Sequence, residues 1–346
     1  MGRGGVLGIL AVVLVACSPA ASSGTGSKTD AGAPGPPKVL VWAGLREPAA
    51  FDSVIGLGGS GSPAAEVTPV VHDFLVVLNH RSEPVAQLAA ARPSVSDGTW
   101  RVNTDGSMDT IWRLRPNIKW HDGTLLTSDD LLFALNLSID PQLPKSQFGG
   151  LPYMASAEAP DQLTMIIHWS ATYSHADREV GLGPLPSRLL AEHYRSPKDD
   201  FLNDPYFSTA FVGLGPYRLV HWEPGAQMEF TRFDDYYLGR PRLDGVIVRF
   251  IGDPVTMLAN AEAGSVDIAT PALSANLDAI AELRDRWGGT ANRVVFDPSD
   301  SLRHLQLQFR PEFARPIGGL TNQAVRQALY TAIDRQALTD LMTRGA

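Results

Sequence analysis

The chain has 346 residues, of which 44% are hydrophobic and 19% are charged, and its formal net charge is −8. This balance is that of a globular protein long enough for about two domains. The negative charge and the lack of a basic stripe argue against a nucleic-acid-binding protein. Cys17 is the only cysteine, so an intrachain disulfide framework is excluded.

The first residues have the pattern of a secretion signal. Arg3 is followed by the apolar run 6–15, and Ala16 precedes Cys17. About ten apolar residues are too few to span a bilayer and are typical of a signal-peptide core. The Ala16-Cys17 pair resembles the lipobox of bacterial lipoproteins, which predicts removal of residues 1–16 and lipidation of Cys17. The alternative is a plain secretory signal with an incidental cysteine.

Residues 18–37 are dominated by Ala, Ser, Gly, Thr and Pro. This composition buries too little apolar surface to offset its ordering entropy, so it predicts a flexible tether. Residues 38–43 predict the first strand. The glycine-rich stretch 56–61 lacks the Gly-Lys-Ser/Thr ending of a phosphate-binding loop, so we interpret it as a surface loop.

Residues 110–136 predict two short strands and a helix. Segments 98–105 and 110–114 fit a hairpin, in which Trp112 and Leu114 share one face. Pro116-Asn117 ends the strand, Ile118 and Trp120 resume the alternation, and a turn follows at 122–123.

The helix that follows has a clear start signal. Thr127 is the predicted N-cap, and Asp130, three residues later, completes a capping-box-like pair. Leu126 and Leu131 are spaced to pack against each other across the helix start. Acidic residues in the first turn suit the positive end of the helix.

Later segments carry further periodic signals. Strands are predicted at 161–169, 217–223, 227–232, 246–250 and 266–269, with a turn at 224–225. Helices are predicted at 184–194, at 277–287 and up to about Glu262, where Gly264 is a natural C-cap. Leu305, Leu307 and Phe309 alternate as a strand. Residues 323–342 place their apolar side chains on one helical stripe.

Several of these segments together resemble one family. Residues 112–134 follow, almost position by position, the Leu-Arg…Lys-Trp-His-Asp-Gly…Leu-Thr-Ser-x-Asp signature of family 5 extracytoplasmic solute-binding proteins, the peptide and nickel receptors of ABC importers. Residues 46–52, 213–219, 236–241, 264–267 and 325–335 resemble further landmarks of the same family. Leu214 replaces the small polar residue usual in the second of these.

The resemblance implies an α/β, two-lobe fold like that of periplasmic binding proteins (type II, cluster C). We expect a signal peptide at 1–16, a lipidated linker at 17–37 and a first lobe at 38–269. This lobe would have mixed sheets and an inserted subdomain at about 76–170. Residues 270–346 would begin a second lobe that is incomplete, as if the C-terminal portion of a longer protein were lacking. A naturally short homologue is the alternative.

The resemblance also implies a function. We expect a substrate-binding lipoprotein of an ABC importer that captures oligopeptides or a similar solute between its lobes. It would be extracytoplasmic, held to the cell membrane by its lipid, and would deliver the solute to the permease subunits. The alternative is a truncated, non-transport lipoprotein that binds partners or senses a signal. By position in the family pattern, the residues expected near the cleft are Leu45, Arg46, Tyr153, Thr270 and Pro271.

Some side chains of the 112–134 block could be taken for a metal or catalytic site. His121, Asp122, Asp129 and Asp130 lie on a turn and a helix cap rather than at the separations of a zinc site, so we expect structural roles. Ser128 lies near His121 and Asp122 but in no nucleophile-elbow pattern. We therefore expect no enzyme activity, no cofactor and no metal site.

Overall fold

The computed structural model describes residues 36–44, 46–51, 64–144, 149–178, 182–270, 277–295, 307–310, 312–313, 315–316 and 318–343. The chain divides into two units, Met1–Pro36 and Pro37–Ala346, and every helix and strand given below lies in the second. The predicted signal segment, tether and Cys17 lie outside the described residues, apart from the end of the tether.

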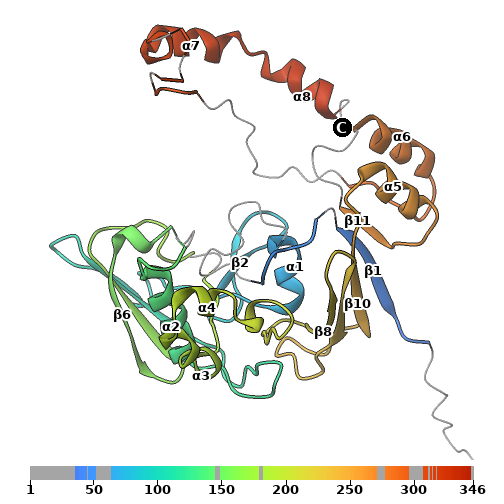
Figure 1. Ribbon diagram of the computed structural model, residues 1–346. Helices are drawn as coiled ribbons and strands as arrows, with labels where there is room; N and C mark the ends of the chain where they lie inside the picture. The colour runs from blue at the N-terminus through green and yellow to red at the C-terminus, as the bar shows by residue number, and fades with distance from the viewer. Residues whose placement is uncertain are drawn as a thin grey trace, which may run out of the picture. The chain divides into compact units, whose positions relative to one another are not determined.

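The described ranges contain eleven strands. Figure 1 labels several of them. The strands are β1 (Val39–Gly44), β2 (Val76–Leu78), β3 (Pro84–Ala86), β4 (Trp100–Val102), β5 (Met108–Arg113), β6 (Met154–Asp161), β7 (Thr164–Trp169), β8 (Tyr217–Glu223), β9 (Gln227–Arg232), β10 (Gly245–Phe250) and β11 (Ile268–Thr270). The α-helices are α1 (Ala64–Val71), α2 (Ser128–Ile139), α3 (Ser187–Leu190), α4 (Lys198–Leu202), α5 (Pro254–Glu262), α6 (Leu277–Trp287), α7 (Gln323–Ala332) and α8 (Arg335–Thr343). Short 3₁₀ turns are η1 (Leu151–Tyr153), η2 (His193–Arg195), η3 (Pro205–Phe207) and η4 (Gly319–Thr321).

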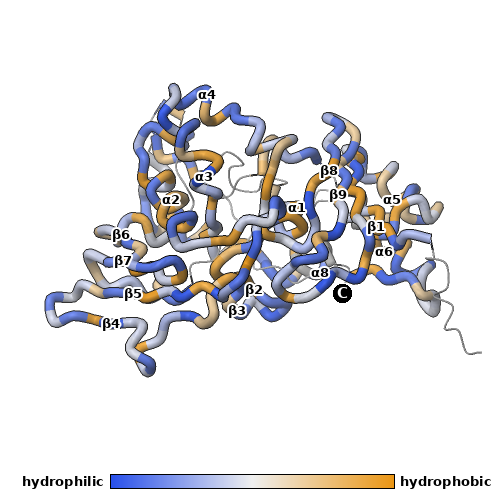
Figure 2. Tube along the Cα trace, turned by 90° about the horizontal axis from the view of Figure 1, so that it is seen from below, coloured by the Kyte–Doolittle hydropathy of each residue, from blue (hydrophilic) through white to orange (hydrophobic). Residues whose placement is uncertain are grey.

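A five-stranded mixed sheet has the order β11-β1-β10-β9-β8. Strand β1, next to the edge strand β11, pairs in parallel with β10 and β11, whereas β10, β9 and β8 form an antiparallel meander. The predicted turn between β8 and β9 is confirmed, and Gly225 adopts there the positive φ of 77° that glycine tolerates. In Figure 2, β1 and α1 include orange, apolar stretches.

A second, four-stranded sheet has the order β4-β5-β7-β6, and all its pairs are antiparallel. The predicted β4–β5 hairpin is confirmed, and β5 buries Met108, Thr110 and Trp112 on one face while Arg113 is exposed. The predicted strand around Ile118 and Trp120 reduces to one bridge between Lys119 and Leu125. Ile118 and Trp120 are nevertheless buried, because the turn at Gly123 folds them onto the core.

Helix α2 begins where the sequence predicted. Thr127 is the N-cap, and the capping box with Asp130 is formed. The Asp130 carboxylate accepts a hydrogen bond from the Thr127 N–H at 3.1 Å. The predicted helix at 184–194 is shorter, since only α3 and η2 are helical there.

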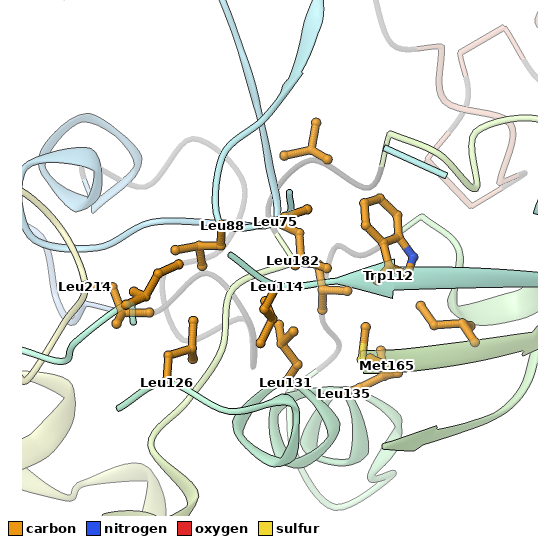
Figure 3. Close-up of a cluster of buried hydrophobic side chains, with 14 of the residues drawn as sticks. Leu75, Leu88, Trp112, Leu114, Leu126, Leu131, Leu135, Met165, Leu182 and Leu214 are labelled. Carbon is orange, nitrogen blue, oxygen red and sulfur yellow. The ribbon is translucent and has the colours of Figure 1, made fainter. Parts of the chain in front are cut away.

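Two hydrophobic cores meet on α2. Leu131 and Leu135 belong to the core of the four-stranded sheet, together with Trp112 and Met165 (Figure 3). Ala134 and Leu137, on the other side of the same helix, belong to the core of the five-stranded sheet, which is rich in phenylalanine. We call these the second core and the first core. Because one helix serves both, the two sheets are joined by shared packing and not only by chain connections.

Three predicted elements differ from the structure. The buried strand predicted at 266–269 starts only at Ile268, which is 44% exposed, while Val266 is buried without lying in the strand. Residues 307–310, the described part of the strand predicted around Phe309, form no strand. The helix predicted at 323–342 is two helices, α7 and α8, because Ile333 is extended.

Residues 277–287 form α6 as predicted. Arg286 of α6 forms an ion pair with Glu262 of α5, which joins this helix to the preceding one. Gly264 ends α5 with a positive φ of 69°, as expected of a helix C-cap. In the part of the chain that the structure describes, no helix combines the length and apolarity needed to cross a bilayer.

Candidate functional site

The carboxyl ends of three parallel strands meet at one edge of the five-stranded sheet. At the end of β1, Gly44 pairs with Phe250 of β10 and with Thr270 of β11. The β8–β9 turn reaches the same edge, since the Phe250 N–H donates to the Ala226 carbonyl at 2.9 Å. Ligands of open α/β sheets bind outside such strand ends. We call this region the carboxyl edge and treat it as the candidate site.

The segment that follows β1 is tied across this edge by Glu47. One carboxylate oxygen of Glu47 accepts from Trp222 Nε1 at 2.6 Å, and the other accepts from the Gly225 N–H at 2.9 Å. Further along, the Phe51 ring packs edge-on against Trp222, with 5.3 Å between ring centroids. The exposed Arg46, next to Glu47, is thereby held at the carboxyl edge.

The Thr270 hydroxyl is the centre of a second polar group. It accepts a hydrogen bond from Trp42 Nε1 at 2.9 Å and lies 3.4 Å from both the Ala43 carbonyl and a carboxylate oxygen of Glu66. With one hydrogen to donate, it can serve only one of those two acceptors at a time. Glu66 is exposed in the first turn of α1. The edge therefore presents a hydroxyl, a carboxylate and a guanidinium.

The predicted cleft residues divide into three groups. Arg46 follows β1 and Thr270 ends the adjacent strand β11, so both lie at the carboxyl edge. Tyr153 lies in η1, where its ring stacks on Tyr173 with 4.9 Å between centroids, and Tyr173 packs against the second core. A role for Tyr153 in a site shared with Thr270 stays a prediction. Leu45 and Pro271 lie outside the described residues.

Sequence reasoning missed Trp42, Glu47 and Glu66 as members of this site. Glu47 stood inside a matched motif, but Trp222 and Gly225 are 175 and 178 residues away from it. No local pattern reports a pair so distant. The only local signal was the place of Glu47 directly after Arg46.

The motif residues His121 and Gly213–Gly215 hold each other rather than a ligand. The backbone N–H of His121 donates to the Gly213 carbonyl at 2.9 Å, and the backbone N–H of Gly213 donates to the ring nitrogen Nδ1 of His121 at 3.2 Å. The other ring nitrogen, Nε2, then donates to the Gly215 carbonyl at 3.0 Å, which requires the neutral ring. Burial lowers the pKa of His121 to about 4 and favours the same form. This histidine is a neutral cross-link between two segments.

The carboxylates around the α2 cap also have structural partners. Asp122 pairs with Arg188 and accepts from Thr124, and Asp130 accepts from Trp120 Nε1 at 3.3 Å and from the Ser187 N–H at 2.9 Å. The Ser128 hydroxyl donates to the Asp161 carbonyl. Among the described residues, no group of three or more His, Cys, Asp or Glu side chains is placed to hold a metal ion.

Comparison with known families agrees with this reading of the motifs. Residues 90–346, most of the chain, match the family described as bacterial extracellular solute-binding proteins, family 5 Middle. The chain belongs to this family. Members of family 5 are substrate-binding proteins rather than enzymes.

Family 5 relatives support the same assignment. The chain is 23% identical to the oligopeptide-binding protein AppA of Bacillus subtilis over 345 residues, which cover 98% of the chain and 58% of AppA. It is 22% identical to heme-binding protein A of Haemophilus influenzae over 350 residues, which cover 97% of the chain and 60% of that protein. The chain thus spans about 60% of the length of these relatives.

A solved structure shows the shared fold. NikZ from Campylobacter jejuni, crystallised with Ni(L-His), superposes with a TM-score of 0.63 at 21% identity, covering 88% of this chain and 55% of NikZ. The expected α/β fold of two-lobe periplasmic binding proteins is confirmed by this likeness.

Proposed function

We propose that this family 5 protein is the substrate-binding lipoprotein of an ABC importer and captures oligopeptides or a similar solute for delivery to a membrane permease. Family membership and the likeness to AppA, named for oligopeptide binding, support the transport role. The observation that carries the proposal is the carboxyl edge, where Arg46, Thr270 and Glu66 surround the ends of β1 and β11.

The chemistry of this edge suits a peptide. β11 is the outermost strand of the five-stranded sheet, so within the described ranges one side of its main chain has no strand partner. An extended peptide can add to an outer strand such as β11 through main-chain hydrogen bonds, which tolerate many side chains. The Thr270 hydroxyl and the two charged side chains offer further donors and acceptors for peptide groups and termini.

We also propose that the first lobe spans residues 38–269, with an inserted subdomain at about 76–170, and that the second lobe begins at 270. In support, the four strands of the second sheet all lie between Trp100 and Trp169. The last strand of the five-stranded sheet ends at Thr270.

Photo-crosslinking tests the proposed site. The probe is a nonapeptide library carrying benzoylphenylalanine, with the adduct mapped by mass spectrometry on the purified chain. We expect adducts at the carboxyl edge, and a several-fold lower yield in Arg46→Ala and in Thr270→Val. The Leu78→Ala variant, in the exposed β2–β3 hairpin, is the control and keeps the yield. Equal yields in all variants, or adducts confined to other surfaces, would refute peptide binding at this edge.

Lipid anchoring is tested by cell fractionation. If Cys17 carries the anchor, Cys17→Ser moves the protein from the membrane fraction to the soluble fraction, because the acyl chains supply the membrane affinity. Ser22→Ala, in the tether, is the matched control and leaves the distribution unchanged. Membrane partition that survives in Cys17→Ser would contradict the anchor.

A further inference from the structure

Asp73 is a buried carboxyl group whose hydrogen-bond partners, among the described residues, are all neutral. It follows α1 and is 5% exposed. One of its oxygens accepts from the Tyr236 hydroxyl at 2.9 Å and from the Tyr237 hydroxyl at 3.0 Å. The other lies 3.3 Å from Gln87 Nε2, a weaker contact. This cluster ties the β9–β10 connection and the segment after β3 to the end of α1.

Charged and titratable groups surround the cluster on each packed element without pairing with Asp73. His72, which lies between the end of α1 and Asp73, is buried among Phe74, Trp120 and Phe211. Arg115 Nε donates to the Gln87 backbone carbonyl at 2.7 Å and forms no ion pair with the Asp73 carboxyl in the described part of the chain. The β9–β10 connection carries Asp235, whose carboxylate pairs with Lys119 at 2.8 Å. Within the described ranges, no ion pair compensates Asp73.

We propose that Asp73 is a proton-binding latch: the β9–β10 connection is held more tightly by the Asp73 cluster in mildly acidic than in neutral solution. This proposal goes beyond solute binding and does not depend on it. The tyrosine hydroxyls can donate to either form of the carboxyl, but the protonated form carries no buried charge. Opening of the connection gives the ionised form access to water, so ionisation favours opening.

The electrostatics set the pH range of the latch. Burial raises the pKa of Asp73 to about 6, and the bonds from Tyr236, Tyr237 and Gln87 oppose this rise only in part. An opened, hydrated Asp73 has its ordinary pKa of 3.8. The latched state therefore binds the proton more tightly, so latching strengthens as pH falls from about 6 toward 4 and is constant above that range. Between pH 7.5 and pH 5, we expect about a tenfold decrease in opening.

Hydrogen exchange at residues 233–240 measures the opening directly. The N–H groups of Tyr236 and Gly239 donate within this connection, to Phe233 and Tyr236. After correction for the intrinsic exchange rate, the full chain should show about tenfold less opening at pH 5 than at pH 7.5. The β8–β9 turn, remote from Asp73 in the hydrogen-bond pattern, serves as the internal control. Equal opening at the two pH values would overturn the proposal.

Two variants and one titration make the test specific. Asp73→Asn keeps an acceptor for the tyrosines but cannot ionise, so its opening should not change with pH. Asp235→Asn, a matched change in the same connection, should keep the tenfold dependence. Should Asp73→Asn fail to fold, carbon-13 NMR of the Asp73 carboxyl in the unchanged chain decides the question. A titration midpoint near pH 6 supports the latch, and a midpoint near pH 4 refutes it.

Discussion

At the scale of single residues, His72 and His121 are neutral rings packed inside the protein. Burial lowers the pKa of His72 to about 3; repulsion between the protonated forms of His72 and His121 adds to the effect, and the Pro184 carbonyl opposes it. The pKa of His121 is lowered to about 4, chiefly by burial. Below pH 6.5 the unfolded chain takes up protons at both rings while the folded chain does not, so the folded state loses stability.

We therefore expect the free energy of unfolding to fall between pH 6.5 and pH 4, by on the order of 3 kcal/mol for each ring. Asp73 opposes this loss in part, since its raised pKa adds stability below pH 6. Urea denaturation at pH 7, 5.5 and 4 measures the change. His72→Phe should reduce the fall in the free energy of unfolding at acid pH, whereas His221→Gln, at an exposed site, should not. If the free energy of unfolding of His72→Phe falls at acid pH as steeply as that of the unchanged chain, this account is contradicted.

The glycines of the Gly213–Gly215 motif are required by close backbone contact. A Cβ on Gly213 would lie 1.9 Å from the Val71 carbonyl oxygen, which cannot move without displacing α1. Gly213→Ala should therefore cost about 3 kcal/mol or more in unfolding free energy. Gly98→Ala is the control: it has a positive φ of 75° but open space, and should cost only about 1 kcal/mol. Equal losses in thermal or urea unfolding would show that contact with Val71 does not matter.

At the scale of elements, the start of α2 is held by one carboxylate. Thr127→Ala should cost about 1 kcal/mol of stability, the usual value for an N-cap, and leave any solute affinity unchanged. Asp130→Ala should cost about 3 kcal/mol, because the Trp120, Thr127 and Ser187 donors all lose their acceptor. Urea unfolding measures both changes. A strong loss of affinity in a fully stable Thr127→Ala protein would instead make this block part of the binding site.

Helices and strands that are determined by a pattern within their own residues were predictable from the sequence. The β8–β9 hairpin follows from alternation around a Pro-Gly turn, and α6 follows from its helical period. The prediction of one helix at 323–342 was wrong because the apolar period continues without a break through the N-terminal cap of α8. Asp334 accepts from the Ala337 N–H at 2.9 Å and starts α8, and such a cap interrupts the helix without disturbing the apolar stripe.

The candidate site was predictable only in part, for a related reason. Arg46 lies two residues after β1 and Thr270 is the last residue of β11, so a strand pattern alone places both near strand ends. Their partners depend on pairing between distant segments: Thr270 meets Trp42 from 228 positions away. Single-sequence periodicity carries no information about such pairings. The start of β11 was misplaced for the same reason, since its pairing with Trp42 begins only at Ile268.

At the scale of the whole molecule, the described C-terminal helices differ from the rest in burial. α7 has no buried residue, and Leu329, Tyr330 and Leu338 are 44%, 67% and 48% exposed. Segments with few buried apolar contacts open readily, so limited trypsin digestion should cut after Arg326 and Arg335 before it cuts after Arg232. Mass spectrometry of the early fragments checks this order. Early cleavage after Arg232 would contradict it.

The place of β1 in its sheet has a consequence for how the protein is made. Among the described strands β1 is synthesised first, yet both of its neighbours come from far along the chain: Lys38 bonds Asp244, 206 positions away, and Val41 bonds Asp267, 226 positions away. Closing such long loops is entropically costly and slows folding. The pairing of β1 must therefore wait until both β10 and β11 have been made. Until then the apolar β1 lacks its native partners, so its correct pairing during synthesis requires the chain to reach residue 270.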